Sequence, residues 1–385
     1  MRKKIDLLHV YAGTRGASGL YLDEIYNALK CKYKQEVIVS AFYPFSYGKK
    51  WFYRYSDISS IKLNILNINI IRKAVRFCEL ILTLIRTFIY IKIKKIRFVN
   101  YGLTSDLKIE LFFIKLLKFK SDVKIIVTCH DVLPFGSDNP IILSKKIAKK
   151  KNFFDIADFL LIHNENSKKE LKKYYNISDK KVFMIYFPLM DLNNLEIEHT
   201  AIKLIKNKGQ FTIGMFGNLR QEKGVDVLLK AWSKVHEQSK NLQLIIAGYV
   251  PPNIDYCFEN YKDKSVLIYD QFICDSEFKS LISTCDLVVL PYKRGTNSGI
   301  PSQIISSGTL VLASDIPMFK NNSIILKDFL FKSEDYNDLF RKILWASSLG
   351  KEEIEGYDKN NKKLLRNYKE LFSDKIILEF DQIIK

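Results

Sequence analysis

Short apolar runs alternate along the chain with longer segments in which apolar residues recur every three or four positions. In the first half, the apolar runs predict strands at residues 5–11, 37–42, 96–101, 124–129, 159–163 and 182–186. Helical periodicity lies between them, at residues 21–31, 108–118 and 145–157. Strands that are apolar throughout and separated by helices predict a parallel sheet covered on both faces.

The same alternation restarts after a polar stretch at residues 190–210, which we interpret as a linker. Strands are expected at residues 211–216, 243–247, 266–269, 287–290, 311–313 and 323–325, with helices at 224–237, 275–284, 302–308 and 335–349. The fold class predicted is therefore α/β, with two doubly wound halves. We expect one domain at residues 1–189, a second at 211–367, and a C-terminal helix at 368–385 that returns to the first domain.

The excess of positive over negative charge is confined to the first half of the chain. Residues 1–187 hold 35 Lys and Arg against 16 Asp and Glu, whereas residues 188–385 hold 26 of each kind. This asymmetry indicates an anionic partner for the first half, such as nucleic acid, acidic lipid headgroups or a phosphorylated acceptor, unless it is only a solvated basic surface. No helix-turn-helix, RNA-recognition or zinc module is recognisable, so nucleic acid is the least favoured partner.

Cysteine use and hydropathy indicate a cytoplasmic protein. The six cysteines are scattered without a Cys-x-x-Cys pair, which predicts neither a metal site nor a disulfide framework. No signal-peptide pattern precedes the first strand. Residues 70–93 form the most apolar long segment, but charged residues interrupt it, and its polar positions make one narrow stripe. That pattern favours a helix packed on a sheet, or one lying in a membrane interface, over a membrane span.

The loop after the predicted strand at 211–216 combines a glycine with cations. Gly217 lets the backbone approach a ligand, and Arg220 and Lys223 stand just before a helix that begins near residue 224. A helix N-terminus beside two cations suits a diphosphate, although the residues alone fit an exposed cationic loop equally well.

A second loop of this kind follows the strand at 287–290. Its Asn297, Ser298 and Gly299 lead into a helix that contains Gln303, so backbone and side-chain donors gather at another helix start.

The order of these motifs resembles that of the GT-B glycosyltransferases, and specifically glycosyltransferase family four. The similarity is carried by FGNLRQEKGVDVLLKA (216–231), IIAGY (245–249), CDLVVLPY (285–292) and SGIPSQIISSGTLVLASD (298–315). It implies two Rossmann-like domains that face each other across a cleft. It also implies that Arg220, Lys223 and the backbone at Asn297, Ser298 and Gly299 hold the donor diphosphate. Phe272 and Ile273 fall where the family cradles the nucleobase.

The first half agrees with this resemblance. The turn at residues 13–19, with Gly16 and Gly19, is similar to the family's glycine-rich loop near the donor phosphates, and VTCHDVLPF (127–135) is similar to its His-Asp motif. His130 is therefore the candidate catalytic residue. The other four histidines belong to no cluster in the sequence, and we expect structural or surface positions for them.

One departure from the family concerns its two glutamates, which stand eight positions apart. The matching residues here are Gly295 and Gln303, so neither carboxylate is present, although Gln303 can hydrogen-bond a ribose hydroxyl. The sugar-binding role of the first glutamate is not carried over.

The resemblance implies a hexosyltransferase that retains anomeric configuration and needs no metal or other cofactor, because no Asp-x-Asp occurs near a strand end. The substrate would be a nucleotide-sugar, such as a UDP- or GDP-sugar. Charge and resemblance together predict a lipid-linked or glycan acceptor, as in polysaccharide, lipopolysaccharide O-antigen or capsule assembly. The enzyme would be peripheral on the inner face of the plasma membrane, through basic segments 72–97 and 145–151. The alternatives are a GT-B sugar-nucleotide epimerase and a basic nucleic-acid-binding protein.

Overall fold

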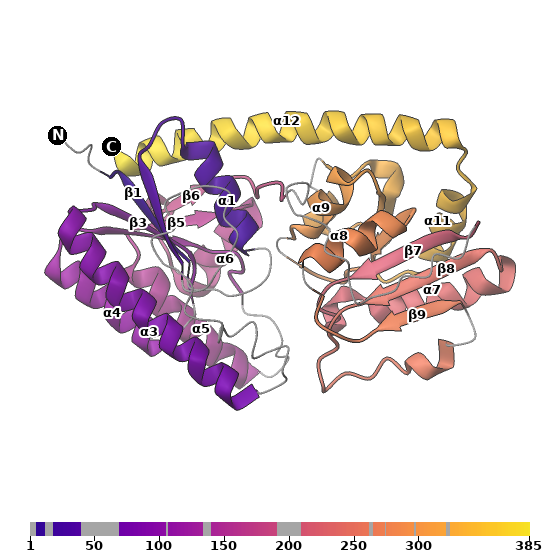
Figure 1. The fold of residues 1–385 in the computed structure, drawn as a ribbon, viewed down its shortest axis with the longest axis horizontal. Helices are drawn as coiled ribbons and strands as arrows, with labels where there is room; N and C mark the ends of the chain where they lie inside the picture. The colour runs from indigo at the N-terminus through magenta and orange to yellow at the C-terminus, as the bar shows by residue number, and fades with distance from the viewer. Residues whose placement is uncertain are drawn as a thin grey trace. The chain divides into compact units, whose positions relative to one another are not determined.

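The chain divides into two compact units in the computed structural model (Figure 1). Residues 5–11, 18–39, 69–104, 107–133, 140–190, 209–261, 265–273, 275–295, 298–320 and 324–385 are described. Unit 1 comprises Met1–Pro188 and Glu370–Lys385, and unit 2 comprises Leu189–Lys369. Most of the predicted linker, residues 191–208, lies outside the described residues.

Unit 1 is built on a six-stranded sheet in the order β2-β1-β3-β4-β5-β6, with every pair parallel. Its strands are β1 (Leu7–Tyr11), β2 (Gln35–Val39), β3 (Phe98–Leu103), β4 (Lys124–Thr128), β5 (Phe159–Ile162) and β6 (Val182–Met184). Its helices are α1 (Ser18–Leu29), α3 (Asn69–Lys94), α4 (Lys108–Lys120), α5 (Pro140–Ile156), α6 (Glu165–Tyr175) and the short η1 (Asp179–Lys181).

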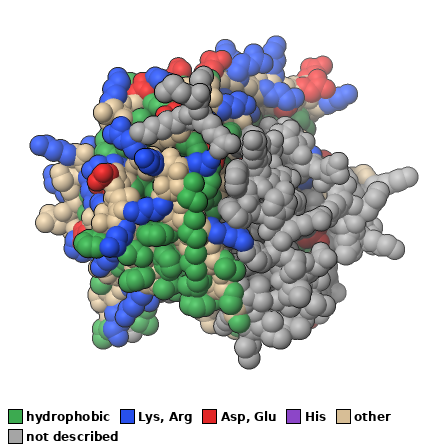
Figure 2. All heavy atoms as spheres, turned by 60° about the vertical axis from the view of Figure 1, so that its left-hand side comes forward, with side chains coloured by type: hydrophobic (Ala, Val, Ile, Leu, Met, Phe, Trp, Pro, Cys, Tyr) green, Lys and Arg blue, Asp and Glu red, His purple; other side chains and the backbone are tan. Residues whose placement is uncertain are grey.

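Helices α3 and α4 pack side by side, and both send apolar residues into the core. Their outward sides also carry large apolar residues, and a space-filling view shows hydrophobic side chains gathered on this side of the molecule (Figure 2). In the described part of the chain, no helix is long and apolar enough to cross a membrane.

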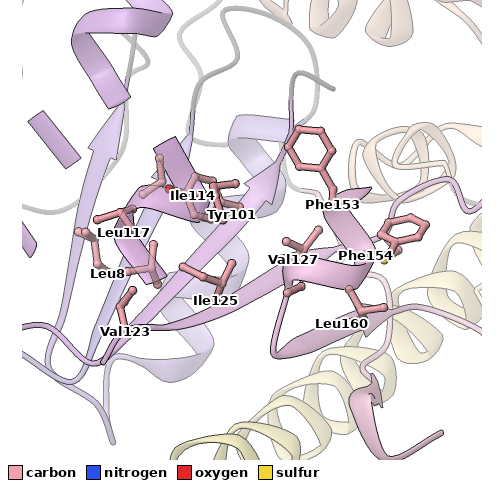
Figure 3. Packing of buried hydrophobic residues seen from close by; sticks show 14 of the residues in the cluster. Leu8, Tyr101, Ile114, Leu117, Val123, Ile125, Val127, Phe153, Phe154 and Leu160 are labelled. Carbon is pink, nitrogen blue, oxygen red and sulfur yellow. The ribbon is translucent and has the colours of Figure 1, made fainter. Parts of the chain in front are cut away.

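The main core of unit 1 lies between one face of the sheet and helices α3 to α6. Alternate strand residues meet the inward faces of the helices there, as expected for a parallel sheet covered by crossover helices (Figure 3). The strands contribute Leu8, Tyr101, Ile125, Val127 and Leu160, and the helices contribute Ile114, Leu117, Phe153 and Phe154.

The opposite face of the same sheet is covered by α1, and the end of α12 (Lys351–Ile384) is buried within unit 1. His9 points to this face and hydrogen-bonds Gln35 at 2.7 Å and Asn100 at 3.1 Å. Asp381, near the end of α12, accepts hydrogen bonds from Lys32 and Tyr33. These contacts anchor the C-terminal part of the helix within unit 1.

Unit 2 repeats the architecture with a parallel sheet in the order β12-β11-β10-β7-β8-β9. Its strands are β7 (Phe211–Phe216), β8 (Leu242–Ala247), β9 (Val266–Tyr269), β10 (Leu287–Leu290), β11 (Leu310–Ser314) and β12 (Leu330–Phe331). Its helices are η2 (Gln221–Lys223), α7 (Val225–Gln238), η3 (Phe258–Tyr261), α8 (Asp275–Thr284), α9 (Ile300–Ser306), α10 (Pro317–Lys320), η4 (Lys327–Phe329) and α11 (Tyr336–Ser348), together with the first part of α12.

The predicted α/β class is confirmed, and most predicted elements agree with the structure within a few residues. Two predictions are wrong, and one helix is longer than expected. Residues Ile324 and Ile325 form no strand, and the last strand is the two-residue β12 instead. The last helix is far longer than the expected segment, with 34 residues. Gly19 does not lie in the turn before the first helix, because α1 begins at Ser18.

Candidate functional site

The loops that follow β7 and β8 approach each other closely at the carboxyl end of the unit 2 sheet. Gly217 has φ 117° and Gly248 has φ 152°, a region that side chains rarely adopt. A Cβ on Gly248 would stand 1.6 Å from the carbonyl oxygen of Gly217. The backbone therefore occupies the space that side chains would fill, and ligands bind parallel α/β sheets at this end of the strands.

Arg220 lies in the same loop and pairs with a buried carboxylate. Its Nε is 3.0 Å from Oε1 of Glu222, and the Glu222 carbonyl accepts a hydrogen bond from the Lys293 amide at 2.9 Å. Lys293 also pairs with Asp226 at the start of α7, with 2.8 Å between Nζ and Oδ2. The loop after β10 is thus bound to the loop after β7, which brings cations from both together.

Lys223 is positioned by an aromatic ring. Its ammonium lies 3.6 Å from the centroid of Tyr292, a buried residue of the loop after β10, in a cation–π arrangement. Gly224, the next residue, has φ 72°, and a Cβ there would stand 1.8 Å from the Pro291 carbonyl oxygen. Helix α7 begins directly afterwards, without a side-chain cap at its N-terminus. Two loop cations and a helix start of this kind favour a bound anion.

The segment around α9 shows a packing role that the sequence did not predict. A Cβ on Gly299 would stand 2.3 Å from the sulfur of Met190, whose amide donates to Ser302 Oγ at 3.0 Å. The absence of a side chain at Gly299 therefore leaves room for Met190, near the start of unit 2. Gln303 is buried in α9, Ser298 Oγ accepts a long hydrogen bond from the Ile300 amide, and Asn297 lies outside the described residues.

The two residues expected beside a nucleobase follow β9. Phe272 is 47% exposed, whereas Ile273 is half-buried. A large aromatic ring that stays exposed after a buried strand offers a surface on which a flat ligand can stack.

In unit 1, His130 follows β4 and is half-buried among aromatic rings. Its Nε2 is 2.8 Å from the Gly102 carbonyl oxygen, which can only accept, so Nε2 carries the proton. Burial lowers the pKa of His130, and the hydrogen bond to Gly102 opposes this shift. The neutral ring then keeps the lone pair on Nδ1, which gives His130 a potential proton acceptor.

His163 corrects the expectation that the other histidines belong to no cluster. Its ring centroid lies 5.5 Å from that of His130, and Tyr21 and Phe187 contact both rings. Burial and the neighbouring His130 hold the pKa of His163 well below its usual value. His163 directly follows β5 and His130 follows the adjacent β4, so neighbouring parallel strands bring them together. In the sequence, the only signal of this cluster was that His130 and His163 stand at the ends of successive predicted strands.

Gly19 belongs to the first turn of α1, and Gly16 lies outside the described residues. Among the residues that the structure describes, no group of three or more His, Cys, Asp and Glu side chains could hold a metal ion.

The two parallel six-stranded sheets with flanking helices define a GT-B architecture. The *Anabaena* protein Alr3699/HepE, solved in complex with UDP, has a TM-score of 0.61 with 13% sequence identity, and 98% of each chain is covered. Sucrose-phosphate synthase from *Thermosynechococcus elongatus* has a TM-score of 0.64, again with 13% identity over 98% of each chain. Both confirm the fold.

The sequence comparison is more specific than the fold. Residues 196–364 match the family described as glycosyl transferases group 1. The matched segment includes β7, α7 and the loops described above. An uncharacterized glycosyltransferase of *Bacillus subtilis*, YqgM, is 22% identical over 208 residues, which cover 51% of this chain. The chain spans about half of that relative's length, with 55% covered.

Proposed function

We propose that this protein is a glycosyltransferase that takes its sugar from a nucleoside-diphosphate sugar held by the loops after β7 and β10. The observation that carries the proposal is the meeting of Arg220, Lys223 and the start of α7 at one edge of the group 1 domain. HepE has been solved with UDP and with UDP-glucose, which supports a uridine nucleotide among the possible donors.

Breaking the bond between the sugar and the diphosphate leaves negative charge on the leaving phosphate. Arg220 and Lys223 stabilise that charge, and the first amides of α7 add their partial positive charge. Asn297, Ser298, Gly299 and Gln303 would complete the diphosphate and ribose contacts, with Phe272 and Ile273 against the base. Together these groups can do this chemistry without a metal, as the resemblance to family four implies.

His130 is the proposed contact of unit 1 with the reacting groups. A neutral imidazole whose Nε2 donates to Gly102 can accept a hydrogen bond at Nδ1 from a sugar or acceptor hydroxyl. In a retaining transfer, the acceptor oxygen attacks C1 on the face that the diphosphate leaves, and the hydroxyl proton passes to the departing phosphate. A protein nucleophile is then not needed.

The proposed acceptor is a lipid-linked glycan, and the transferred sugar a hexose, as in polysaccharide, O-antigen or capsule assembly. The net positive charge of the first half supports an acceptor that carries phosphate at an anionic membrane. The enzyme would then work at the inner face of the plasma membrane as a peripheral protein.

The direct test incubates the purified chain with radiolabelled UDP- and GDP-hexoses and lipid-linked acceptors, in EDTA and in Mg²⁺. We expect transfer of label to the lipid fraction with one donor, at equal rates with and without metal. Donor turnover without any acceptor would contradict the proposal and favour an epimerase. Product NMR tests retention, and an inverted anomeric centre would refute it.

A matched pair of variants tests the donor site itself. Lys223→Ala removes the cation above Tyr292, whereas Lys230→Ala removes an exposed lysine of α7. Loss of one preorganised charge contact should lower kcat/KM on the order of a hundredfold in Lys223→Ala. Lys230→Ala should retain the activity of the unchanged protein. Equal activity in the two variants would contradict the proposed placement of the diphosphate.

A further inference from the structure

The outward sides of α3 and α4 expose large apolar side chains at regular helical spacing. Ile85, Ile89 and Ile93 of α3 are 38%, 49% and 70% exposed, and Phe112 and Phe119 of α4 are 56% and 80% exposed. Single exposed apolar residues are ordinary on a protein surface, but a contiguous group marks an interaction site. We call these five residues the α3–α4 patch.

Helix α3 departs from the usual pattern of a surface helix. Thr83 and Thr87 of α3 are buried, and Thr87 donates its hydroxyl to the Thr83 carbonyl at 2.7 Å. A helix on a sheet normally keeps its polar residues outside and its apolar stripe inside. Here α3 is apolar on both sides, so burial in the core does not explain its outward isoleucines.

The two outward faces form one surface, because the ends of the helices lie side by side. The Lys92 ammonium of α3 donates to the Lys120 carbonyl at the end of α4. In the space-filling view, Lys and Arg side chains stand beside the hydrophobic area on the side that carries these helices (Figure 2).

Charge around the patch is of one sign. Over residues 80–95 and 107–120 the sequence contains a single carboxylate, Glu110, and it is fully buried. The same segments contain Arg86 and seven lysines, which are Lys92, Lys94, Lys95, Lys108, Lys115, Lys118 and Lys120. Lys118 is held by Asp158 at 3.0 Å, while Lys120 lies 4.8 Å from the centroid of the exposed Phe119 ring.

We propose that the α3–α4 patch docks on the interface of an anionic lipid bilayer. Lysines interspersed with exposed Phe and Ile match the pattern of interfacial helices, in which apolar side chains enter the acyl boundary and ammonium groups reach the headgroups. A protein partner fits less well, because lysine is depleted in protein–protein interfaces. This proposal names the surface through which the proposed enzyme reaches its membrane acceptor. It rests on the proposed function only for the identity of that acceptor.

Two lysines of the second basic segment that the sequence suggested have partners within unit 1. Within residues 145–151, Lys150 donates to the Asp131 carbonyl and Lys151 pairs with Asp155 at 2.9 Å. Those two ammonium groups are engaged inside unit 1. The exposed apolar residues instead put the centre of the docking surface on α3 and α4.

Vesicle flotation of the full chain, without donor or acceptor, tests the proposal. We expect binding to vesicles that contain phosphatidylglycerol, weak binding to phosphatidylcholine alone, and release as salt is raised. Phe112→Ser/Phe119→Ser should weaken binding by about tenfold or more, because two apolar rings no longer enter the bilayer. Lys115→Glu/Lys120→Glu should weaken binding to the anionic vesicles alone.

Leu371→Ser/Leu378→Ser is the matched control, since these leucines of α12 are also more than half exposed. It should bind vesicles as the unchanged chain does. Equal binding by all variants, or no preference for anionic lipid, would overturn the proposal. A concentration-dependent dimer that the phenylalanine variant abolishes, with no vesicle binding, would assign the patch to a second copy of this chain. Nucleotide binding, measured on the same samples, separates this failure from failure of the proposed function.

Discussion

Burial controls the protonation of the histidines in unit 1. His9 is fully buried between Gln35 and Asn100, and desolvation lowers its pKa to about 4, against the opposing effect of the Gln35 hydrogen bond. Burial also lowers the pKa of His130 and of His163. These rings are therefore neutral at physiological pH, which suits hydrogen bonding rather than charge pairing.

This burial predicts a loss of stability in mild acid. Histidines in the unfolded chain titrate near pH 6.5, whereas His9 in the folded chain titrates near 4. Between these values the unfolded state binds more protons, so the free energy of unfolding falls as pH drops from about 6.5 toward 4. His9→Gln should reduce that slope by up to about 1.4 kcal/mol per pH unit. Urea unfolding at several pH values measures it, and an unchanged slope would refute the assignment.

Two glycines with similar positive φ angles allow the cost of the backbone conformation to be distinguished from the cost of a steric clash. Gly224 and Gly308 have φ 72° and 82°, but only Gly224 has a backbone oxygen, that of Pro291, where its Cβ would stand. Gly308→Ala should cost about 1–2 kcal/mol of unfolding free energy, the usual penalty for this region. Gly224→Ala should cost more and also abolish nucleotide binding, as thermal unfolding with and without nucleotide would show. Equal losses in both variants would contradict the close approach.

At the scale of elements, the C-terminal helix α12 packs into unit 1 through apolar residues near its end. Phe372, Ile376, Phe380 and Ile383 of α12 are buried in unit 1, and Asp381 binds Lys32 and Tyr33 beside them. The apolar residues recur at steps of three and four only in this last part of the helix. The preceding part is mostly charged, which concealed its helical character from periodicity.

Truncating the buried face of α12 should destabilise unit 1. Phe380→Ala removes a fully buried ring and should cost about 3–5 kcal/mol. Leu378→Ala removes an exposed side chain of the same helix and should change stability by less than about 0.5 kcal/mol. Chemical unfolding followed by circular dichroism compares the two. Similar losses would mean that the helix end does not pack as described.

Strands and crossover helices could be predicted because apolar runs and helical periodicity are local signals. Helix α6 was missed, although Asn164 caps it by accepting from the Ser167 amide at 2.8 Å, a pattern visible in the sequence. The final strand was misplaced because Ile324 and Ile325 are apolar and buried, as strand residues are. Pairing with β11 selects Leu330 and Phe331 instead, and pairing cannot be read from local composition.

At the scale of the whole molecule, the position of Gly217, Arg220 and Lys223 in the loop after β7 was predictable because an apolar run precedes them. Their partners were not, since the Lys223–Tyr292 and Arg220–Glu222 contacts and the Met190–Gly299 packing depend on tertiary approach. The +19 net charge indicated an anionic partner, but only the structure shows which helices expose apolar residues beside their lysines. The His130–His163 cluster likewise required the strand order.

Nucleotide binding is the most direct test of the central claim that unit 2 holds a nucleoside-diphosphate donor at Lys223. Thermal unfolding would be followed with UDP, GDP, dTDP, CMP and ADP, each with and without Mg²⁺, in the unchanged chain, Lys223→Ala and Lys230→Ala. A ligand at 100 times its Kd stabilises by about 2.7 kcal/mol, which moves a melting transition by several degrees. We predict a metal-independent shift with a nucleoside diphosphate that is lost in Lys223→Ala and kept in Lys230→Ala. No shift with any nucleotide, or a shift that survives Lys223→Ala, would contradict the account.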